Sequence, residues 1–312
     1  MIAAHALTRY YGRTRAVGNV TFDITGNGII GLLGHNGAGK STIMKMLSGY
    51  LEPSGGSVEI DGHDMMQDAR KVQRTLGYLP ESLPLYPEML VADYLDYAAA
   101  LKGIKSSNRP AAIREALLAT DLVARAVEPI DSLSRGLKQR VGVAQAIMGQ
   151  PKLLILDEPT NGLDPSQTEQ MRELIRRLSR QATVILSTHI MQEVDALCDR
   201  VLILNEGRLV LDKSMETLRN SQTLLLRSCQ SVSNLGDLLA DLPDVASVER
   251  RNSKPERAEF LLQINPGADQ DTAAGTIGQA VVSAGARLHT LEPLGHDLDA
   301  IFREATREAA GE

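Results

Sequence analysis

A glycine-rich stretch, GHNGAGKS, runs from Gly34 to Ser41 and has the spacing G-x-x-x-x-G-K-[ST]. Glycines in such a loop allow successive backbone N–H groups to point inward around a phosphate group. Lys40 would bring a positive charge to the β- and γ-phosphates of a nucleotide, and the Ser41 hydroxyl is a candidate ligand of Mg²⁺. The stretch therefore predicts a phosphate-binding loop, whose expected contact residues are Gly34, His35, Asn36, Gly37, Ala38, Gly39, Lys40, Ser41 and Thr42.

A second candidate group is the stretch LLILDEP, residues 153–159. Asp157 ends an apolar run and would emerge at the carboxyl edge of a strand, where open α/β sheets bind their ligands. Its carboxylate would hold Mg²⁺ directly or through water. Glu158 would accept a proton from an attacking water if its carboxylate reaches the γ-phosphate. Without the glycine-rich loop, the same two residues would indicate only a strand end and a turn at Pro159.

The hydrophobic pattern predicts the elements that must position these residues. Continuous apolar runs of β-favouring residues predict buried strands at 28–34, 152–157 and 183–189. Apolar residues at helical spacing predict helices at 41–51 and 166–181. Because strands and helices alternate, we expect a parallel, doubly wound sheet. An Asn-Glu-Gly turn between two β runs, within residues 201–212, predicts a hairpin at the end of this sheet.

Two further regions have patterns of their own. The segment from about 82 to 150 is helix-rich and predicts a helical subdomain inserted into the sheet domain. After about residue 220 the pattern restarts as strand, helix, two strands, helix and strand, followed by a last helix at LDAIFREATREA. The order βαββαβ is typical of a ferredoxin-like split motif. We therefore expect a first domain at 1–217 and a small α+β domain at 218–312.

Charge and hydropathy limit the class of partner. Lys and Arg total 33 against 39 Asp and Glu, and the resulting net charge of -6 predicts no nucleic-acid partner. The N-terminus lacks the apolar core of a signal peptide, and no run approaches the roughly 18 to 20 apolar residues that a spanning helix needs. We therefore expect the chain to reach a membrane only through another protein.

Three more stretches stand in a fixed order around LLILDEP: LSRGLKQR at 133–140, NGLD at 161–164 and STH at 187–189. Together with the glycine-rich loop they resemble the Walker A, signature, Walker B, D-loop and H-loop motifs of the ATP-binding cassette (ABC) ATPases. The resemblance covers roughly residues 1–215. It implies an α/β P-loop NTPase cassette with a mixed sheet and an inserted helical subdomain, which binds ATP and Mg²⁺ and hydrolyses ATP.

The resemblance also implies roles for single residues. Tyr11 would stack on adenine, and His189 would contact the γ-phosphate and orient the water together with Glu158. The signature completes the nucleotide site of a second copy, so that Ser134, Gly136 and Asp164 would lie across a dimer interface. Without the other motifs, Tyr11 would be an ordinary strand aromatic and Asp164 a helix N-cap.

The sequence departs from the family pattern at two places. Glu81, in GYLPESLPLY, stands where many members of the family have glutamine; its carboxylate could still face Mg²⁺ or a bound water. In the signature, Arg135 and Leu137 replace a glycine and the glutamine, whereas Ser134 and Gly136 are retained. We therefore expect catalytic activity to survive the change at Glu81, and Ser134 and Gly136 to supply the hydroxyl and the close backbone approach of the signature.

The GYLPE variant, the form of the signature and the C-terminal domain resemble the ABC-2 exporter ATPases, particularly the gliding-motility-associated group. In such systems the ATPase is a separate chain that pairs with a membrane permease. The resemblance thus implies a homodimer of this chain at the cytoplasmic face of the cell membrane, held there by the permease. SLPLYPEMLVADYL, residues 82–95, is the candidate docking site, although its apolar residues would also form the subdomain's own core.

Other functions stay open on the sequence alone. A related group serves copper-site assembly in nitrous oxide reductase. An ABC-type ATPase acting on DNA or the ribosome is a further alternative, disfavoured by the net charge of -6. The cassette could also be a non-transport switch, with the C-terminal domain as its ligand sensor.

Overall fold

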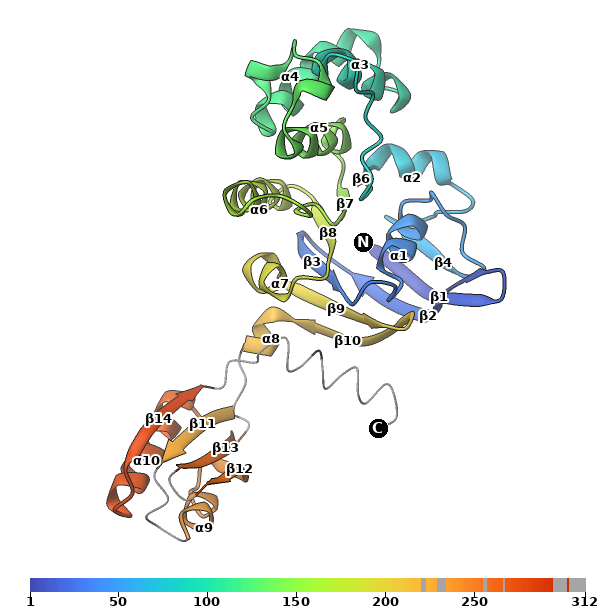
Figure 1. Cartoon of the computed structure of the whole chain (residues 1–312). Coiled ribbons are helices and arrows are strands. Elements are labelled where there is room, and N and C mark those ends of the chain that lie inside the picture. Colours follow the sequence, from blue (N-terminus) through green and yellow to red (C-terminus); the bar gives the residue numbers. More distant parts are fainter. Residues whose placement is uncertain (220–222, 229–233, 255–256, 266, 294–301, 303–312) are drawn as a thin grey trace. The chain divides into compact units, whose positions relative to one another are not determined.

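The computed structural model describes residues 1–219, 223–228, 234–254, 257–265, 267–293 and 302. The chain divides into two compact units, one comprising Met1–Met215 together with Phe302 and the other beginning at Glu216. Figure 1 shows the elements of each unit. In the described part of the chain, no helix is long and apolar enough to cross a membrane.

A six-stranded sheet forms the centre of the first unit, in the order β10-β9-β3-β8-β7-β6. Neighbouring strands are parallel except β10, which pairs antiparallel with β9 through the predicted hairpin turn. The predicted α/β fold with a mixed sheet is therefore confirmed. The strands are β3 (Gly28–Leu33), β6 (Leu76–Leu79), β7 (Leu153–Asp157), β8 (Thr183–Thr188), β9 (Arg200–Asn205) and β10 (Arg208–Ser214).

A four-stranded antiparallel sheet, in the order β2-β1-β4-β5, completes the strands of this unit. It consists of β1 (Ile2–Tyr11), β2 (Thr14–Ile24), β4 (Gly55–Ile60) and β5 (His63–Asp64). Helix α1 (Lys40–Leu47) buries Ile43, Met44, Met46 and Leu47 in one hydrophobic core with residues of both sheets. This packing on two sheets fixes the helix that follows the glycine-rich loop, because a closely packed interior tolerates little movement.

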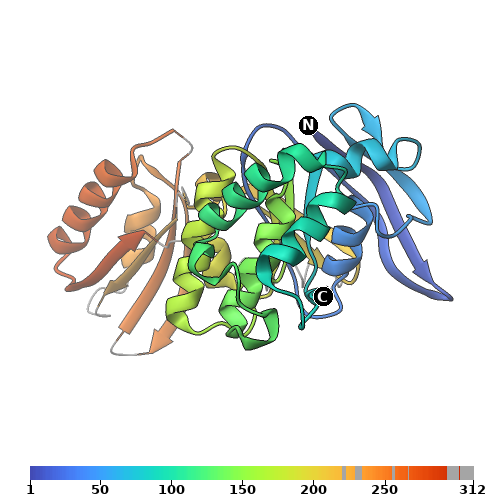
Figure 2. The ribbon, with the colours of Figure 1, turned by 90° about the horizontal axis from the view of Figure 1, so that it is seen from above.

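Three helices form the helical part of the first unit: α3 (Val91–Leu101), α4 (Arg109–Ala119) and α5 (Arg135–Ile147). They share a hydrophobic cluster of their own that includes Leu95, Leu117 and Val141. Figure 2 shows these green helices gathered together, with the blue strands β1 and β2 side by side. The unit's other helices are α2 (Ala69–Thr75), α6 (Pro165–Ser179), α7 (Met191–Leu197) and the short turns η1 (Ser106–Asn108), η2 (Val123–Arg125) and η3 (Ile130–Ser132).

Helix α8 (Met215–Arg219) leads into the second unit, where a four-stranded antiparallel sheet has the order β12-β13-β11-β14. The elements along the chain are β11 (Thr223–Ser228), α9 (Leu235–Ala240), β12 (Val245–Lys254), β13 (Arg257–Ile264), α10 (Gln270–Ser283) and β14 (Leu288–Pro293). This is the predicted βαββαβ order, with both helices contributing to the core. The last predicted helix, at 298–309, lies outside the described residues except for Phe302.

Candidate active site

The glycine-rich loop connects β3 to α1 and closes around a cavity of about 460 Å³. Two glycines permit the tight path of the backbone. A Cβ at Gly34 would lie 2.6 Å from the carbonyl oxygen of Leu204, and Gly39 has a φ of 102° with the Ala16 carbonyl oxygen 2.8 Å from an added Cβ. The loop residues that line the cavity are His35, Asn36, Gly37, Gly39, Lys40, Ser41 and Thr42, whereas Gly34 and Ala38 are buried behind it.

Lys40 is 6% exposed and points back into the loop. Its Nζ donates a hydrogen bond to the carbonyl oxygen of Gly34 at 2.7 Å and lies 3.6 Å from Oε1 of Glu158. A buried ammonium group needs such partners, because an isolated charge is costly away from water. The loop thus holds a positive charge at the wall of the cavity, where the negative charge of a phosphate would be stabilised.

Asp157 ends β7 and is 1% exposed. Its Oδ1 accepts hydrogen bonds from the hydroxyl of Ser187 at 2.6 Å and from that of Ser41 at 3.2 Å. A carboxylate beside a hydroxyl is the hard oxygen donor set that suits Mg²⁺. In the described residues no group of three or more His, Cys, Asp or Glu side chains could hold a metal ion. If Mg²⁺ binds beside Asp157 and Ser41, phosphate and water oxygens would supply its other ligands.

Glu158 follows the strand in a conformation that few side chains adopt. Its φ is 51°, in the left-handed region that costs a non-glycine residue roughly 1–2 kcal/mol. Its carboxylate is nevertheless buried and contacts Nδ1 of His189 at 3.0 Å and 3.2 Å, in addition to facing Lys40. The strained backbone directs the carboxylate into the cavity wall, which is the placement that a general base requires.

Ser187 is a site residue for which the sequence indicated no role. Its hydroxyl donates to Asp157 and accepts the backbone N–H of Glu158 at 2.9 Å, so one side chain of β8 bonds both to the last residue of β7 and to the residue that follows it. The available signal was its place as the first residue of STH, at the end of a predicted strand.

Two further residues that the sequence did not indicate fix the loop carrying His189. The Thr188 hydroxyl donates to the buried carboxylate of Glu193 at 2.7 Å. It also accepts the backbone N–H of Ile190 at 3.1 Å. These bonds connect the end of β8 to α7 and thereby hold the backbone on either side of His189.

Glu81 is exposed and lines the phosphate cavity together with Lys40 and Ser41. It also lines a larger neighbouring cavity of about 670 Å³, whose lining includes Asp157. The structure thus places Glu81 at the junction of two cavities, beside the residues predicted to hold Mg²⁺.

Ser134, Gly136 and Asp164 do not line the phosphate cavity of their own chain. Ser134 is the N-cap of α5 and accepts a hydrogen bond from the N–H of Leu137, and Asp164 caps α6 by accepting from the N–H of Gln167 at 2.8 Å. A Cβ at Gly136 would lie 2.7 Å from Oε1 of Gln167. Glycine therefore allows the start of α5 to approach the start of α6 closely.

Tyr11 lies at the end of β1 with 48% of its surface exposed, and it too is outside the lining of the phosphate cavity. The guanidinium carbon of Arg9 lies 5.2 Å from the centroid of the Tyr11 ring, which is cation–π distance. Arg9 also donates to the carbonyl oxygen of Glu52 at 2.8 Å. The ring is therefore oriented by a neighbour that is itself anchored.

Comparisons with known proteins agree with this geometry. Residues 17–161 match the family model described as ABC transporter. The chain is 32% identical over 262 residues to the uncharacterized ABC transporter ATP-binding protein YxlF of Bacillus subtilis, covering 84% of this chain and 86% of that protein. It is 36% identical to the bacitracin transport ATP-binding protein BcrA of Bacillus licheniformis, covering 68% of this chain and 69% of the relative.

Among solved structures, an ATP-binding subunit of an ABC transporter superimposes with a TM-score of 0.63 at 30% identity, covering 70% of this chain and 92% of the other. A dimeric ATP-binding cassette in a post-hydrolysis state, bound to ADP and Pi, has the same fold, with a TM-score of 0.62 at 23% identity, covering 69% of this chain and 98% of that one. The chain therefore belongs to the ABC transporter ATP-binding proteins and is an ATP-hydrolysing subunit of this family.

Proposed function

We propose that this chain is the ATPase of an ABC-2 type exporter, that two copies enclose two Mg-ATP molecules, and that the dimer drives a separate membrane permease from the cytoplasmic face of the membrane. Relatives named for bacitracin transport, lantibiotic transport and linearmycin resistance support the exporter type. The form of the signature leads us to propose the gliding-motility-associated group as the subgroup.

In this proposal the residues around the phosphate cavity have separate roles. Lys40 and the amides of the glycine-rich loop bind the phosphates, and Tyr11 stacks on adenine. Glu158 takes a proton from the attacking water while His189 orients that water. Ser41 and Asp157 would hold Mg²⁺, with Glu81 facing it. When bound, the ion would neutralise charge that develops on the transferred phosphoryl group.

The main observation that supports the proposed dimer is the position of Ser134, the serine of the signature. Ser134 starts α5 but does not line its own chain's phosphate cavity. At the N-terminus of a helix, unpaired N–H groups and the helix dipole favour an anion. We therefore assign Ser134, the Gly136 backbone and Asp164 to the nucleotide of the second copy.

The test is the pair Ser134→Ala and Ser134→Arg. Both remove the N-cap of α5, which costs about 1 kcal/mol of stability. Only arginine adds bulk at the proposed interface, so Ser134→Arg should abolish ATP-dependent dimerisation in sedimentation experiments while monomers still bind ATP. A dimer of Ser134→Arg as stable as that of Ser134→Ala would reject the assignment.

We also propose that residues 1–217 act as the nucleotide-binding domain, with the helical subdomain at about 82–150, and residues 218–312 as an accessory or regulatory domain. The antiparallel sheet of the second unit, with its own core, supports this division. Replacing residues 218–301 by a flexible linker, which keeps Phe302 and its ring contact with His35 in the first unit, should leave ATP binding intact and change dimerisation or its regulation. Unchanged dimerisation and turnover would argue against a regulatory role.

A further inference from the structure

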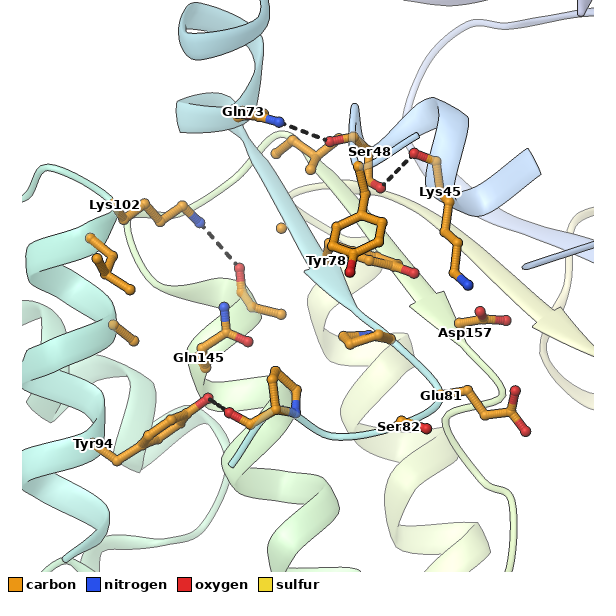
Figure 3. A pocket seen from close by; sticks show the side chains of 18 of the residues that line it. Lys45, Ser48, Gln73, Tyr78, Glu81, Ser82, Tyr94, Lys102, Gln145 and Asp157 are labelled. Carbon is orange, nitrogen blue, oxygen red and sulfur yellow. Dashed lines mark hydrogen bonds between the residues drawn. The ribbon is translucent and has the colours of Figure 1, made fainter. Parts of the chain in front are cut away.

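The glycine-rich loop has a buried base and an exposed tip. Ala38 and Lys40 at the base are 5% and 6% exposed, whereas the tip, residues 35–37, is exposed. Asp157 ends β7 and Glu81 stands just after β6, and Figure 3 shows both at the ends of these strands. The core and the sheet therefore determine where most of the site lies, whereas the position of the tip depends on other contacts.

Phe302 makes such a contact with the tip. The centroid of its ring lies 4.7 Å from that of the His35 imidazole, and the two rings meet edge to face at 85°. Aromatic rings prefer this arrangement, which stabilises a pair beyond the area that it buries. Phe302 is only 3% exposed, so its ring is packed into the first unit and does not lie loosely on the surface. The contact therefore connects an exposed loop residue to a buried one.

The backbone of His35 carries this contact to Lys40. The carbonyl oxygen of His35 accepts the N–H of Ala38 at 3.1 Å, and Nζ of Lys40 lies within hydrogen-bond distance of the same oxygen, at 3.4 Å. Lys40 is the residue that the sequence predicts to bind the β- and γ-phosphates. A displacement of His35 would therefore change the position of the loop carbonyl that helps to hold the ammonium group.

Phe302 reaches the loop from a distant part of the chain. The chain leaves the first unit at Met215 and returns to it at Phe302, and the second unit lies between them in sequence. Met215 is 2% exposed, and its N–H donates to the carbonyl oxygen of Asp199 at 2.7 Å. Both connections to the second unit thus end at buried residues of the first, and one of them is the residue that contacts His35.

We propose that Phe302 is a positioning residue for ATP hydrolysis, whose ring holds His35 and thereby keeps the glycine-rich loop in the conformation that binds phosphate. Without the ring, a smaller fraction of molecules has a competent loop, and the apparent affinity for phosphate falls by that fraction. This inference rests on the proposed role of the loop in binding the nucleotide phosphates. It also gives the region after residue 217 a direct contact with the loop that binds the nucleotide.

The first test compares substitutions that keep or remove the ring. Phe302→Leu retains an apolar side chain but loses the ring, so calorimetric titration of the full chain should show about three- to tenfold weaker binding of tripolyphosphate. Phe302→Tyr keeps the ring and should retain most of the affinity. The KM for ATP should rise by the same factor in Phe302→Leu, whereas kcat at saturating ATP should not change. Wild-type affinity in Phe302→Leu would overturn the proposal.

Phe22→Leu is the matched control for lost packing. Phe22 is 4% exposed, lies in β2 and does not line the phosphate cavity. Phe22→Leu should therefore lower the melting temperature without changing the affinity for tripolyphosphate. An equal loss of affinity in Phe22→Leu and Phe302→Leu would mean that Phe302 acts only through general stability, and it would overturn the positioning role.

The second test asks whether the effect passes through His35. Phe302→Leu should weaken tripolyphosphate binding in the wild-type background but have no further effect in His35→Ala. Equal losses in both backgrounds would overturn the proposal. The contact can also be observed directly, because the chain has six histidines and comparison with His35→Ala assigns the His35 imidazole resonance. Loss of the ring in Phe302→Leu should shift this resonance, and an unchanged shift would overturn the contact.

Failure of this inference can be distinguished from failure of the proposed function. Lys40→Ala removes the charge that is expected to bind the phosphates. If Lys40→Ala binds tripolyphosphate as tightly as the wild type, the proposed role of the loop fails and this inference fails with it. If Lys40→Ala loses binding while Phe302→Leu keeps it, only the role of Phe302 fails.

Discussion

Arg135 donates a hydrogen bond from Nη2 to the carbonyl oxygen of Asn161 at 2.9 Å, and this bond joins the start of α5 to the NGLD loop. The guanidinium lies so close to Gly162 that a Cβ there would collide with it. Gly162 has a φ of 71°, a conformation that already favours glycine. The side chain of Arg135 and the NGLD loop therefore pack closely against each other within a single chain.

Substitutions of Gly162 and Arg135, singly and together, should show that this contact affects dimerisation. Gly162→Ala should impair ATP-dependent dimerisation, because the added methyl group displaces Arg135 and strains the backbone. In the double variant with Arg135→Gly, the collision is removed and only the backbone strain remains. Dimer dissociation constants measured by sedimentation should give a double-mutant cycle with favourable coupling. Strictly additive effects would show that the contact does not link the two loops.

The catalytic assignment predicts a trapped state. Glu158→Gln keeps the shape of the side chain but removes the base, so phosphate release should fall by about 10²–10⁴-fold. ATP should still bind, and the variant should accumulate as an ATP-bound dimer in sedimentation experiments. Glu193→Gln is a useful comparison, because Glu193 is also buried but bonds to Thr188 rather than lining the cavity. Phosphate release at the wild-type rate by Glu158→Gln would contradict the assignment.

Tyr11 should act on the base of the nucleotide and not on its phosphates. Tyr11→Ala should weaken ATP binding by the free energy of stacking one base, about 1–3 kcal/mol. Tyr11→Phe should retain most of this stacking free energy. Arg9→Ala should cost less, about 0.5–1 kcal/mol, because Arg9 acts only by orienting the ring.

Calorimetric titration with tripolyphosphate separates the effect on the base from a structural one. Tripolyphosphate carries the phosphates without base or ribose, so its affinity should be equal in wild type, Tyr11→Ala and Arg9→Ala. A parallel loss of tripolyphosphate binding would instead show a general disturbance of the glycine-rich loop.

Lys102 should make stability depend on alkaline pH. Its pKa falls from 10.5 to about 8 on folding, so between these values the unfolded chain binds more protons than the folded chain. The free energy of unfolding should therefore rise with pH over this window, by up to about 3 kcal/mol. Lys102→Met lacks this contribution, and the difference from wild type in urea denaturation should change between pH 7.5 and 10. A constant difference would mean that Lys102 is not desolvated in the folded state.

Much of the fold could be predicted from sequence because its signals are local. The apolar runs that became β3, β7 and β8 and the turn between β9 and β10 are short, contiguous patterns. The order βαββαβ of the second unit is also visible in the succession of patterns. Hydrophobic burial and turn formation depend on a few neighbouring residues, so tertiary packing did not change the secondary structure of these segments.

The same holds for part of the candidate site. The structure brings Lys40, Ser41, Asp157, Glu158 and His189 together, and each of them stands at or directly beside the end of a predicted strand or the start of a predicted helix. Because strand ends of a parallel sheet share one edge, order along the chain already implies their proximity.

Contacts between distant segments could not be predicted in this way. Ser187 and Asp157 are 30 residues apart, and Arg135 and Asn161 are 26 apart, so no periodicity of a single element indicates either bond. The positive φ of Glu158 also has no sequence signal, since it is a glutamate held in a conformation that usually selects glycine. These features depend on how neighbouring elements pack.

The Ser187 hydroxyl bonds to both Asp157 and Glu158, and these bonds make the site sensitive to shifts in strand register. In the pairing of β7 with β8, Asp157 stands opposite Ser187, and that register alone brings the hydroxyl to both acidic residues. A slip by one residue would move Ser187 by about 3.3 Å and turn its side chain to the other face of the sheet. The alignment of Asp157 with Glu158 is thus a property of strand registry, and insertions or deletions that shift β8 should abolish hydrolysis even where every motif residue is kept.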